Sequence, residues 1–366
     1  MAENDRGILA AHQIEALQAS GALVARPALD LAQLQPASLD LRLSSRAWRM
    51  RASFLPGPQR TVADCIGRLA LHEIDLAAEA VLETGCVYVA ELAESLALAP
   101  EMAASANPKS STGRIDVFTR VIADRAREFD QIEPGYHGPL FAEISPRTFP
   151  ILARAGSRLS QIRFRRGGAR LDDEAHWALH RKERLVTSAE PSIAGGVAIS
   201  VDLAGFDGDG TVGYRAKRHT GLIDVDKIGA QDASEFWETL RVGRRRELVL
   251  DPGEFYILAS KEAVRVPADH AAEMTPFDPL VGEFRVHYAG FFDPGFGLAE
   301  AGGEGSRAVL EVRSHDVPFI LEDGQIVGRL VYERMAQTPH SLYGAGLGSN
   351  YQAQGLKLSK HFRAGG

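Results

Sequence analysis

Short runs in which hydrophobic and polar residues alternate, separated by proline and glycine, make up most of the chain. In residues 38–43 (SLDLRL), three leucines alternate with a serine, an aspartate and an arginine. This pattern predicts a half-buried strand whose polar face carries an acid and a base, either as an exposed ion pair or as part of a functional site. Helical spacing is rare, and residues 11–20 predict one short helix that ends at Gly21.

The pattern also repeats along the chain. Residues 81–89 (VLETGCVYV) match residues 249–257 (VLDPGEFYI), and the same offset places Glu143 on Glu311. The chain therefore reads as a tandem duplication. Because short strands with very little helix fill each half, we expect two all-β domains of the barrel or sandwich type.

The repeat divides the chain into three segments. Residues 1–166 are expected to form the first domain and residues 191–366 the second. Between them, residues 167–190 are rich in charge, with apolar residues scattered through the segment. We interpret this segment as a connector that is partly helical.

Composition and charge narrow the function classes. The net charge of −7 argues against a general nucleic-acid binder, which needs a basic surface. Cys65 and Cys86 stand singly, outside any CxxC pair, which favours a reducing compartment. No stretch resembles a leader or reaches membrane-spanning length. We therefore expect a cytoplasmic protein that binds neither nucleic acid nor membrane.

The two halves carry different chemical groups. Residues 109–114 (KSSTGR) combine hydroxyls, cations and a glycine, a set suited to phosphate oxygens, whereas residues 277–282 (FDPLVG) at the repeat position have lost that set. The segment is not a GxxxxGK[ST] loop, and an ordinary polar turn is an alternative. In the second half, Asp293–Pro294–Gly295 predicts a tight turn, followed by Glu311 within an apolar strand. That carboxylate either faces solvent or serves chemistry.

Taken together, these segments resemble the dCTP deaminases of the trimeric dUTPase-like superfamily, in their longer, duplicated bacterial form. The resemblance is carried by QPASLDLRL (35–43), SSTGR (110–114), AGFFDPGFG (289–297), AVLEV (308–312) and NYQAQG (350–355). It implies a mostly β fold, made of two dUTPase-like barrel or β-clip domains with few short helices. It also implies hydrolytic deamination of dCTP to dUTP and ammonia in dUTP and dTTP biosynthesis.

The resemblance implies catalytic roles for three residues. Glu311 matches the general base that activates the water attacking cytosine C4, and Ser110 and Arg114 match groups that contact water and triphosphate. Such a base takes a proton from water and returns one to the departing amine, as a desolvated glutamate with a raised pKa can do. Glu143, in the matching strand of the first half, is the alternative base.

Further residues match the substrate-binding positions of the family. Asp293 matches the acid that receives the deoxyribose 3′-hydroxyl, and Gln161 belongs to the first-half motifs, since its repeat counterpart is Arg329. The remaining matches are Lys109 and Ser111 for phosphate, Ala289 for the base pocket, and Tyr343 and Gln354 for closure over the phosphates.

Two departures from the family pattern stand out. Asn350 replaces a phosphate-binding lysine, for which Lys357 is the candidate substitute, and residues 298–307 lengthen the hairpin before Glu311. The division of motifs predicts a composite site in which first-half phosphate groups face the second-half hairpin. Whether the halves meet within one chain or between chains stays open.

Metal requirements follow from the residue types. Zinc deaminases use an H-x-E motif with P-C-x-x-C, which this chain lacks, and His287 and His315 have no ligand-like spacing. We therefore expect zinc-independent deamination, with Mg²⁺ entering only on the substrate triphosphate. The expected partners are dCTP, dTTP as a feedback inhibitor, and further copies of the chain in a homo-oligomer.

Two other functions stay open. Because of Asp293, the chain could also be a dUTP pyrophosphatase, or a bifunctional enzyme that deaminates dCTP and hydrolyses dUTP. Because each half has lost several motifs, the chain could instead be a non-catalytic nucleotide-binding regulator.

Overall fold

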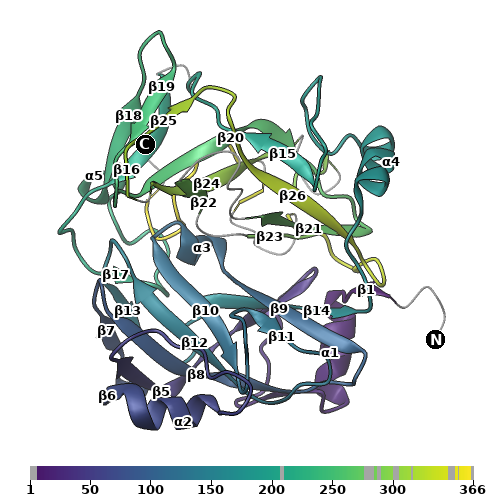
Figure 1. Cartoon of the computed structure of the whole chain (residues 1–366), viewed down its shortest axis with the longest axis vertical. Helices are drawn as coiled ribbons and strands as arrows, with labels where there is room; N and C mark the ends of the chain where they lie inside the picture. The colour runs from purple at the N-terminus through teal and green to yellow at the C-terminus, as the bar shows by residue number, and fades with distance from the viewer. Residues whose placement is uncertain are drawn as a thin grey trace.

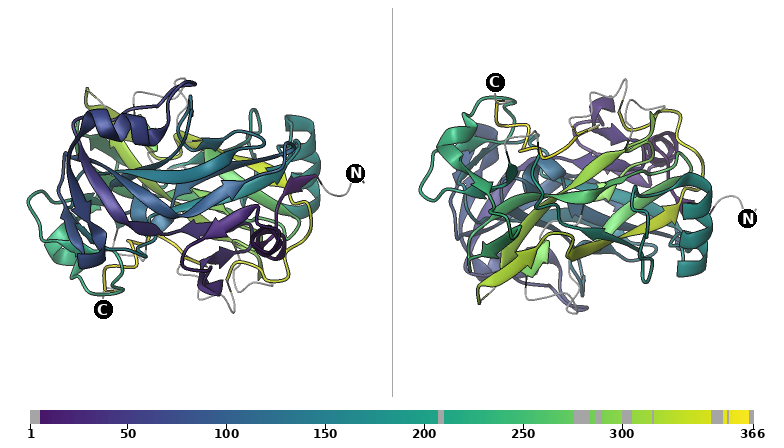
Figure 2. Two further views of the ribbon diagram at one scale, coloured as in Figure 1. Left: turned by 90° about the horizontal axis from the view of Figure 1, so that it is seen from below. Right: turned by 90° about the horizontal axis from the view of Figure 1, so that it is seen from above.

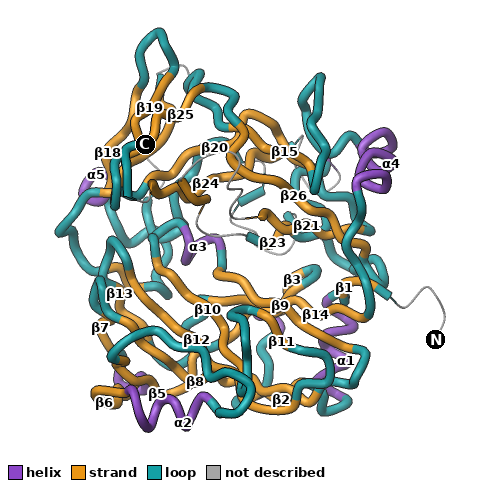
Figure 3. Tube along the Cα trace, in the orientation of Figure 1, coloured by secondary structure: helices purple, strands orange, loops and turns teal. Residues whose placement is uncertain are grey.

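Two β domains lie one above the other in the computed structural model (Figure 1). It describes residues 6–206, 210–275, 284–286 as backbone, 290–299, 305–314, 316–344, 351–352 and 354–363. Helices are few and short in this part: α1 (Ala11–Ala19), α2 (Val62–Leu69), α3 (Ser110–Gly113), α4 (Asp173–Glu183) and α5 (Ala233–Phe236). The expected N-terminal helix is α1, and strands dominate the trace while α3 lies between the two domains (Figure 3).

Two sheets form the body of the first half. One sheet has the order β11-β9-β14-β4-β3, and the other has the order β10-β12-β8-β5-β6. The strands are β1 (Gly7–Ile8), β2 (Leu23–Ala25), β3 (Leu34–Gln35), β4 (Ser38–Leu41), β5 (Leu43–Met50), β6 (Ala70–Asp75), β7 (Ala80–Leu82), β8 (Val87–Ala97), β9 (Met102–Pro108), β10 (Val117–Ala123), β11 (Gln131–Ile132), β12 (His137–Pro146), β13 (Ile151–Ala153) and β14 (Ser160–Arg166).

The second half repeats this plan. Its sheets run β23-β21-β26-β15 and β22-β24-β20-β16-β18, the same order of equivalent strands. The duplication predicted from the sequence is therefore confirmed in the fold. The strands are β15 (Val197–Ser200), β16 (Thr211–Ala216), β17 (Ile223–Asp224), β18 (Trp237–Arg241), β19 (Glu247–Leu250), β20 (Tyr256–Val264), β21 (His270–Thr275), β22 (Phe284–Val286), β23 (Phe291–Phe292), β24 (Ser306–Ser314), β25 (Phe319–Glu322) and β26 (Ile326–Arg334).

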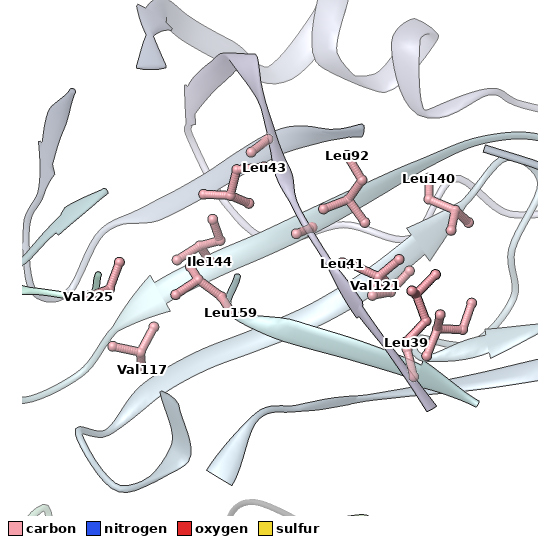
Figure 4. Packing of buried hydrophobic residues seen from close by; sticks show 14 of the residues in the cluster. Leu39, Leu41, Leu43, Leu92, Val117, Val121, Leu140, Ile144, Leu159 and Val225 are labelled. Carbon is pink, nitrogen blue, oxygen red and sulfur yellow. The ribbon is translucent and has the colours of Figure 1, made fainter. Parts of the chain in front are cut away.

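Each half encloses its own apolar core. In the first half, alternate residues of facing strands point inward, among them Leu41, Leu92 and Ile144 (Figure 4). The second core lies between the two sheets of the second half and includes Leu258, Leu310 and Leu330. Period-two alternation along paired strands sends one set of side chains to the core, and the other set is left for contacts outside it.

The two halves are joined by apolar and ionic contacts. Val309 and Ile257, on the outer face of the second-half sheet, pack into the apolar cluster of the first half. Trp237 stacks edge-on against Phe149, and Arg154 makes two contacts of 2.8 and 2.9 Å with Asp224. Figure 2 shows the first half in front when seen from below and the second half in front when seen from above.

Strand pairing also crosses the boundary between the halves. β17 of the second half pairs in parallel with β13 of the first half, through Ile223 opposite Ile151. Within the charged segment 167–190, the helical part is α4, whose first turn is capped by the Asp172 carboxylate. None of the helices in the described ranges is long and apolar enough to cross a membrane.

Candidate active site

A cavity of about 510 Å³ lies between the two halves. Its walls come from both halves of the same chain, which decides the question that the sequence left open. Nine of the residues singled out from the sequence line it: Lys109, Ser110, Ser111, Arg114, Gln161, Asp293, Glu311, Tyr343 and Gln354. Ala289 lies outside the described residues, as do His287, His315, Asn350 and residues 300–304.

The first-half wall is built on β4, β14 and α3. The single turn of α3 is closed by the Thr112 amide, which donates to the Lys109 carbonyl over 2.8 Å. Lys109 forms an ion pair with Asp40, and Asp40 lies opposite Gln161 in the β4–β14 pair. Asp40 is only 3% exposed and lines the cavity. Because all four residues of β4 are buried, the expectation of a half-buried strand is wrong.

Glu311 projects from the middle of β24 toward the first half. It is 4% exposed, and its Oε1 lies 3.8 Å from Arg114 Nε. Burial raises the pKa of the Glu311 carboxyl to about 8, against the opposing effect of Arg114. A carboxyl with this pKa can both accept and release a proton near neutral pH.

Arg114 connects this carboxyl to the C-terminal segment. Its guanidinium stacks 3.9 Å from the centre of the Tyr351 ring, and Nη1 donates to the Lys357 carbonyl over 3.0 Å. Its buried Nε has no hydrogen-bond partner among the described residues. This N–H, close to the Glu311 carboxyl, is available to donate to a ligand oxygen in the cavity.

The predicted turn at 293–295 forms the opposite wall. Gly295 has a φ of +97°, and a Cβ there would come within 2.6 Å of Leu342 Cβ, so glycine is required by both conformation and space. The Tyr343 amide donates to the Pro294 carbonyl over 2.8 Å, and its ring packs against Phe296. Asp293 is buried, and burial raises its pKa.

Gln354 is tied to the start of β24. Its Nε2 donates to the Arg307 carbonyl, and the Arg307 amide donates to the Gln354 carbonyl, both over 3.0 Å. The side-chain oxygen of Gln354 is buried and has no hydrogen-bond partner among the described residues. The tail is thus seated along the cavity, where Ser359 Oγ also donates to the Ser111 carbonyl over 2.8 Å.

The structure adds residues that the sequence reasoning missed. Arg158 and Lys360 line the cavity, and burial and the charge of Lys109 lower the pKa of Lys360. The proposed substitute Lys357 instead places its ammonium 5.8 Å from the Tyr351 ring and does not line the cavity. The signal that the sequence offered for Lys360 is its place as a second lysine in the same C-terminal segment, three residues beyond Lys357.

Arg163 is a further missed residue. It is fully buried, and its Nη2 lies 3.1 Å from Asp293 Oδ1. Its repeat counterpart is Val331. The signal that the sequence offered is an arginine in the first half at a position where the repeat has a valine.

Glu143 does not line the cavity. It is 1% exposed and pairs with Arg120 at 2.6 Å, whose guanidinium stacks 3.4 Å from the centre of the Phe129 ring. No group of three or more His, Cys, Asp or Glu that could hold a metal ion occurs among the residues that the structure describes.

Comparisons with known proteins point in one direction. Family models described as the N-terminal and C-terminal domains of 2′-deoxycytidine 5′-triphosphate deaminase match residues 5–168 and 172–362. The crystal structure of 2′-deoxycytidine 5′-triphosphate deaminase from Agrobacterium tumefaciens superposes with a TM-score of 0.87 at 63% identity, covering 90% of this chain and 99% of that one.

Curated relatives agree at lower identity. The dCTP deaminase of Halorubrum lacusprofundi is 30% identical over 149 residues, which are 40% of this chain and 70% of the relative. A protein of Beutenbergia cavernae named dCTP deaminase, dUMP-forming, is 30% identical over 152 residues, which are 39% of this chain and 75% of the relative.

Proposed function

Because this chain belongs to the dCTP deaminase family, we propose that its composite cavity deaminates dCTP by zinc-independent hydrolysis with Glu311 as general base. The chain is a dCTP deaminase by its relatives; the mechanism and its residues are the proposal. The observation that carries it is the buried Glu311 carboxyl, with a pKa raised to about 8, 3.8 Å from Arg114.

The protons balance with one carboxyl. Glu311 takes a proton from water as the oxygen adds to cytosine C4, and that proton passes to N3. The second proton of the water moves from the new hydroxyl to the 4-amino group as the C–N bond breaks. Ammonia leaves, and C4 carries the carbonyl of dUTP. A raised pKa suits Glu311 to both transfers because the proton is held and released near the working pH.

Arg114 and Ser110 support this chemistry from the first half. The Arg114 guanidinium stabilises the charge that develops on the attacking oxygen, and its unpartnered Nε is the donor for that contact. Ser110 lines the same wall of the cavity and holds water through its hydroxyl. On the opposite wall, the base packs near Gly290 and Val309.

The triphosphate is held by cationic and hydroxyl side chains that line the cavity. Lys109, Ser111, Arg158 and Gln161 contact it from the first half, and Lys360 contacts it from the C-terminal segment of the second half. Tyr343 and Gln354 close over it from the second half. Magnesium arrives as part of the substrate, bound to phosphate oxygens. On the sugar, Asp293 accepts the 3′-hydroxyl.

Zinc independence is supported by the donor set of the cavity. Its described lining offers carboxylates, hydroxyls and guanidinium groups, and includes no histidine or cysteine. A zinc-activated hydroxide needs such soft or imidazole ligands. Treatment with 1,10-phenanthroline, followed by assay with magnesium and dCTP, is expected to leave turnover unchanged; loss of turnover that zinc restores would overturn the proposal.

The product distribution tests the reaction itself. Purified protein with magnesium and dCTP is expected to release ammonia and dUTP in equal amounts, and Glu311→Gln is expected to release neither. Pyrophosphate and dUMP appearing with ammonia would favour the bifunctional enzyme. That second candidate is favoured by one observation, the dUMP-forming names of several relatives at similar identity. Binding of dCTP without products would revive the regulator.

Three wider expectations extend the proposal. The product dUTP would supply pyrimidine deoxynucleotide biosynthesis, dTTP would inhibit as an end product, and the chain would assemble as a homo-oligomer in the cytoplasm. Inhibition curves with dTTP and sedimentation of the purified protein test the second and third.

A further inference from the structure

Arg163 is buried at the boundary between the halves, below the turn that carries Asp293. It leaves β14 of the first half and donates from Nη1 to the Ala272 carbonyl over 3.2 Å and from Nη2 to the Phe292 carbonyl over 3.4 Å. Ala272 and Phe292 are register partners in the β21–β23 pair. The guanidinium therefore grips both strands at the base of the hairpin.

The rest of the guanidinium is equally confined. Its Cζ lies 4.0 Å from the centre of the Phe291 ring, and two carboxylates flank it, Asp293 at 3.1 Å and Glu333 at 3.5 Å. Because 0% of its side chain is exposed, the Arg163 side chain is confined to one conformation. A planar fork held in this way fixes the orientation of the carboxylate that it binds.

The charge of Arg163 also favours the ionised form of the buried Asp293 carboxyl. Asp293 is deeply buried, and burial raises its pKa while Arg163 lowers it. Without the guanidinium, this carboxyl would favour the neutral form and turn freely. A neutral carboxyl is a poorer acceptor for a sugar hydroxyl than a fixed carboxylate.

We propose that Arg163 is a positioning residue that makes Asp293 an oriented acceptor for the 3′-hydroxyl and so sets the preference of the enzyme for a substrate with that hydroxyl. The inference rests on the sugar-binding role given to Asp293 under the proposed function. Arg163 holds Oδ1, which leaves Oδ2 for the substrate. Its repeat counterpart Val331 offers no such group, so this device belongs to one of the two halves.

The test compares dCTP with 2′,3′-dideoxycytidine 5′-triphosphate, which lacks the 3′-hydroxyl. Arg163→Met keeps the length and apolar packing of the side chain and removes the fork. We expect its kcat/KM for dCTP to fall about 10–100-fold while the value for the dideoxy substrate changes less than about threefold. The ratio of kcat/KM for dCTP to kcat/KM for the dideoxy substrate should therefore fall toward one, mainly because KM for dCTP rises. Asp293→Asn should lower this ratio to the same extent.

Two further variants guard against a general loss of structure. Arg163→Lys keeps the charge and stem, so it tests the inference even where the methionine variant does not fold, and it should retain part of the ratio. Glu333→Gln is the matched control, because it changes the other carboxylate on the same arginine; its ratio should stay as in the wild type. Thermal unfolding of each variant reports the structural cost separately.

The possible failures are distinguishable. If Asp293→Asn collapses the ratio and the arginine variants slow both substrates equally, Arg163 is only structural and the inference is wrong. If Asp293→Asn leaves the ratio intact, the sugar-binding role itself is wrong, and the inference falls with it. An unchanged ratio in Arg163→Lys together with a collapsed one in Arg163→Met would limit the role to charge, not to the fork.

Discussion

Glu143 and Glu311 occupy equivalent strands of the two halves and have different surroundings. Each lies opposite an apolar residue of the neighbouring strand, Val89 for Glu143 and Ile257 for Glu311. Glu143 pairs with Arg120 of its own sheet at 2.6 Å, whereas Glu311 faces Arg114 of the other half at 3.8 Å. The same residue at the same strand position is thus structural in one half and a candidate base in the other.

The difference arises from what covers each sheet. In the first half, α2 and its neighbours cover the face with Glu143, through Val62 and Ile66 packed against Phe141. In the second half, that face is covered by the first half itself, as the place of Val309 and Ile257 in the first-half cluster shows. The equivalent sheet face is thus covered by a helix in the first half and by the other domain in the second half.

The largest expected effect separates the two glutamates. Glu311→Gln should reduce kcat at least about 1,000-fold, because it removes the group that takes the water proton. Glu143→Gln should keep kcat within a few-fold and instead destabilise the protein by about 3 kcal/mol, because it leaves Arg120 without its buried partner. Steady-state rates and denaturant unfolding of both variants check this. The reverse pattern would make Glu143 the base.

The pH dependence of stability is the next effect. The folded pKa of Glu311 is about 8, above its usual value of 4.5, so the wild type binds this proton more tightly when folded and loses stability as pH rises through that window. Glu311→Gln does not titrate and should exceed the wild type by about 1–3 kcal/mol above pH 8, with little difference at pH 5. Unfolding at both pH values measures it; an equal gap at the two would contradict the raised pKa.

Activity should follow the same ionisation in the opposite direction. The free enzyme needs Glu311 deprotonated to accept the water proton, so kcat/KM should rise with pH, reach half of its maximum near the pKa of about 8, and level off above it. A profile of kcat/KM for dCTP from pH 5.5 to 9.5 gives the value. If the rise of kcat/KM with pH keeps the same midpoint in Glu311→Asp, the ionisation belongs to another group.

The smallest expected effect concerns the tail cations. Lys360→Met should raise KM for dCTP about 10-fold with kcat nearly unchanged, because one phosphate contact is lost in ground and transition states alike. Lys357→Met is the matched control from the same tail, since Lys357 does not line the cavity, and its KM should stay within about twofold. A larger effect at Lys357 would restore it as the phosphate lysine.

Much of this molecule follows from local pattern. Alternation in SLDLRL predicted a strand, and β4 is there, because side chains on a strand alternate whatever lies around it. The exposure of that strand was predicted wrongly, because alternation does not tell whether the polar face meets water or another domain. Arg163 was missed for the same reason, since its partners lie more than 100 residues away in the chain.

By itself, the sequence determined the β class, the duplication, the division of motifs between the halves and the residue types of the site. These are properties of period and repeat, which neighbouring residues carry. Only the tertiary structure decided that the halves meet within one chain and that Glu311 lines the cavity while Glu143 pairs with Arg120. It also decided that Arg163 contacts Asp293 and that Lys360 lines the cavity. Burial and pairing depend on which distant surface covers a side chain, and that is settled when the domains pack.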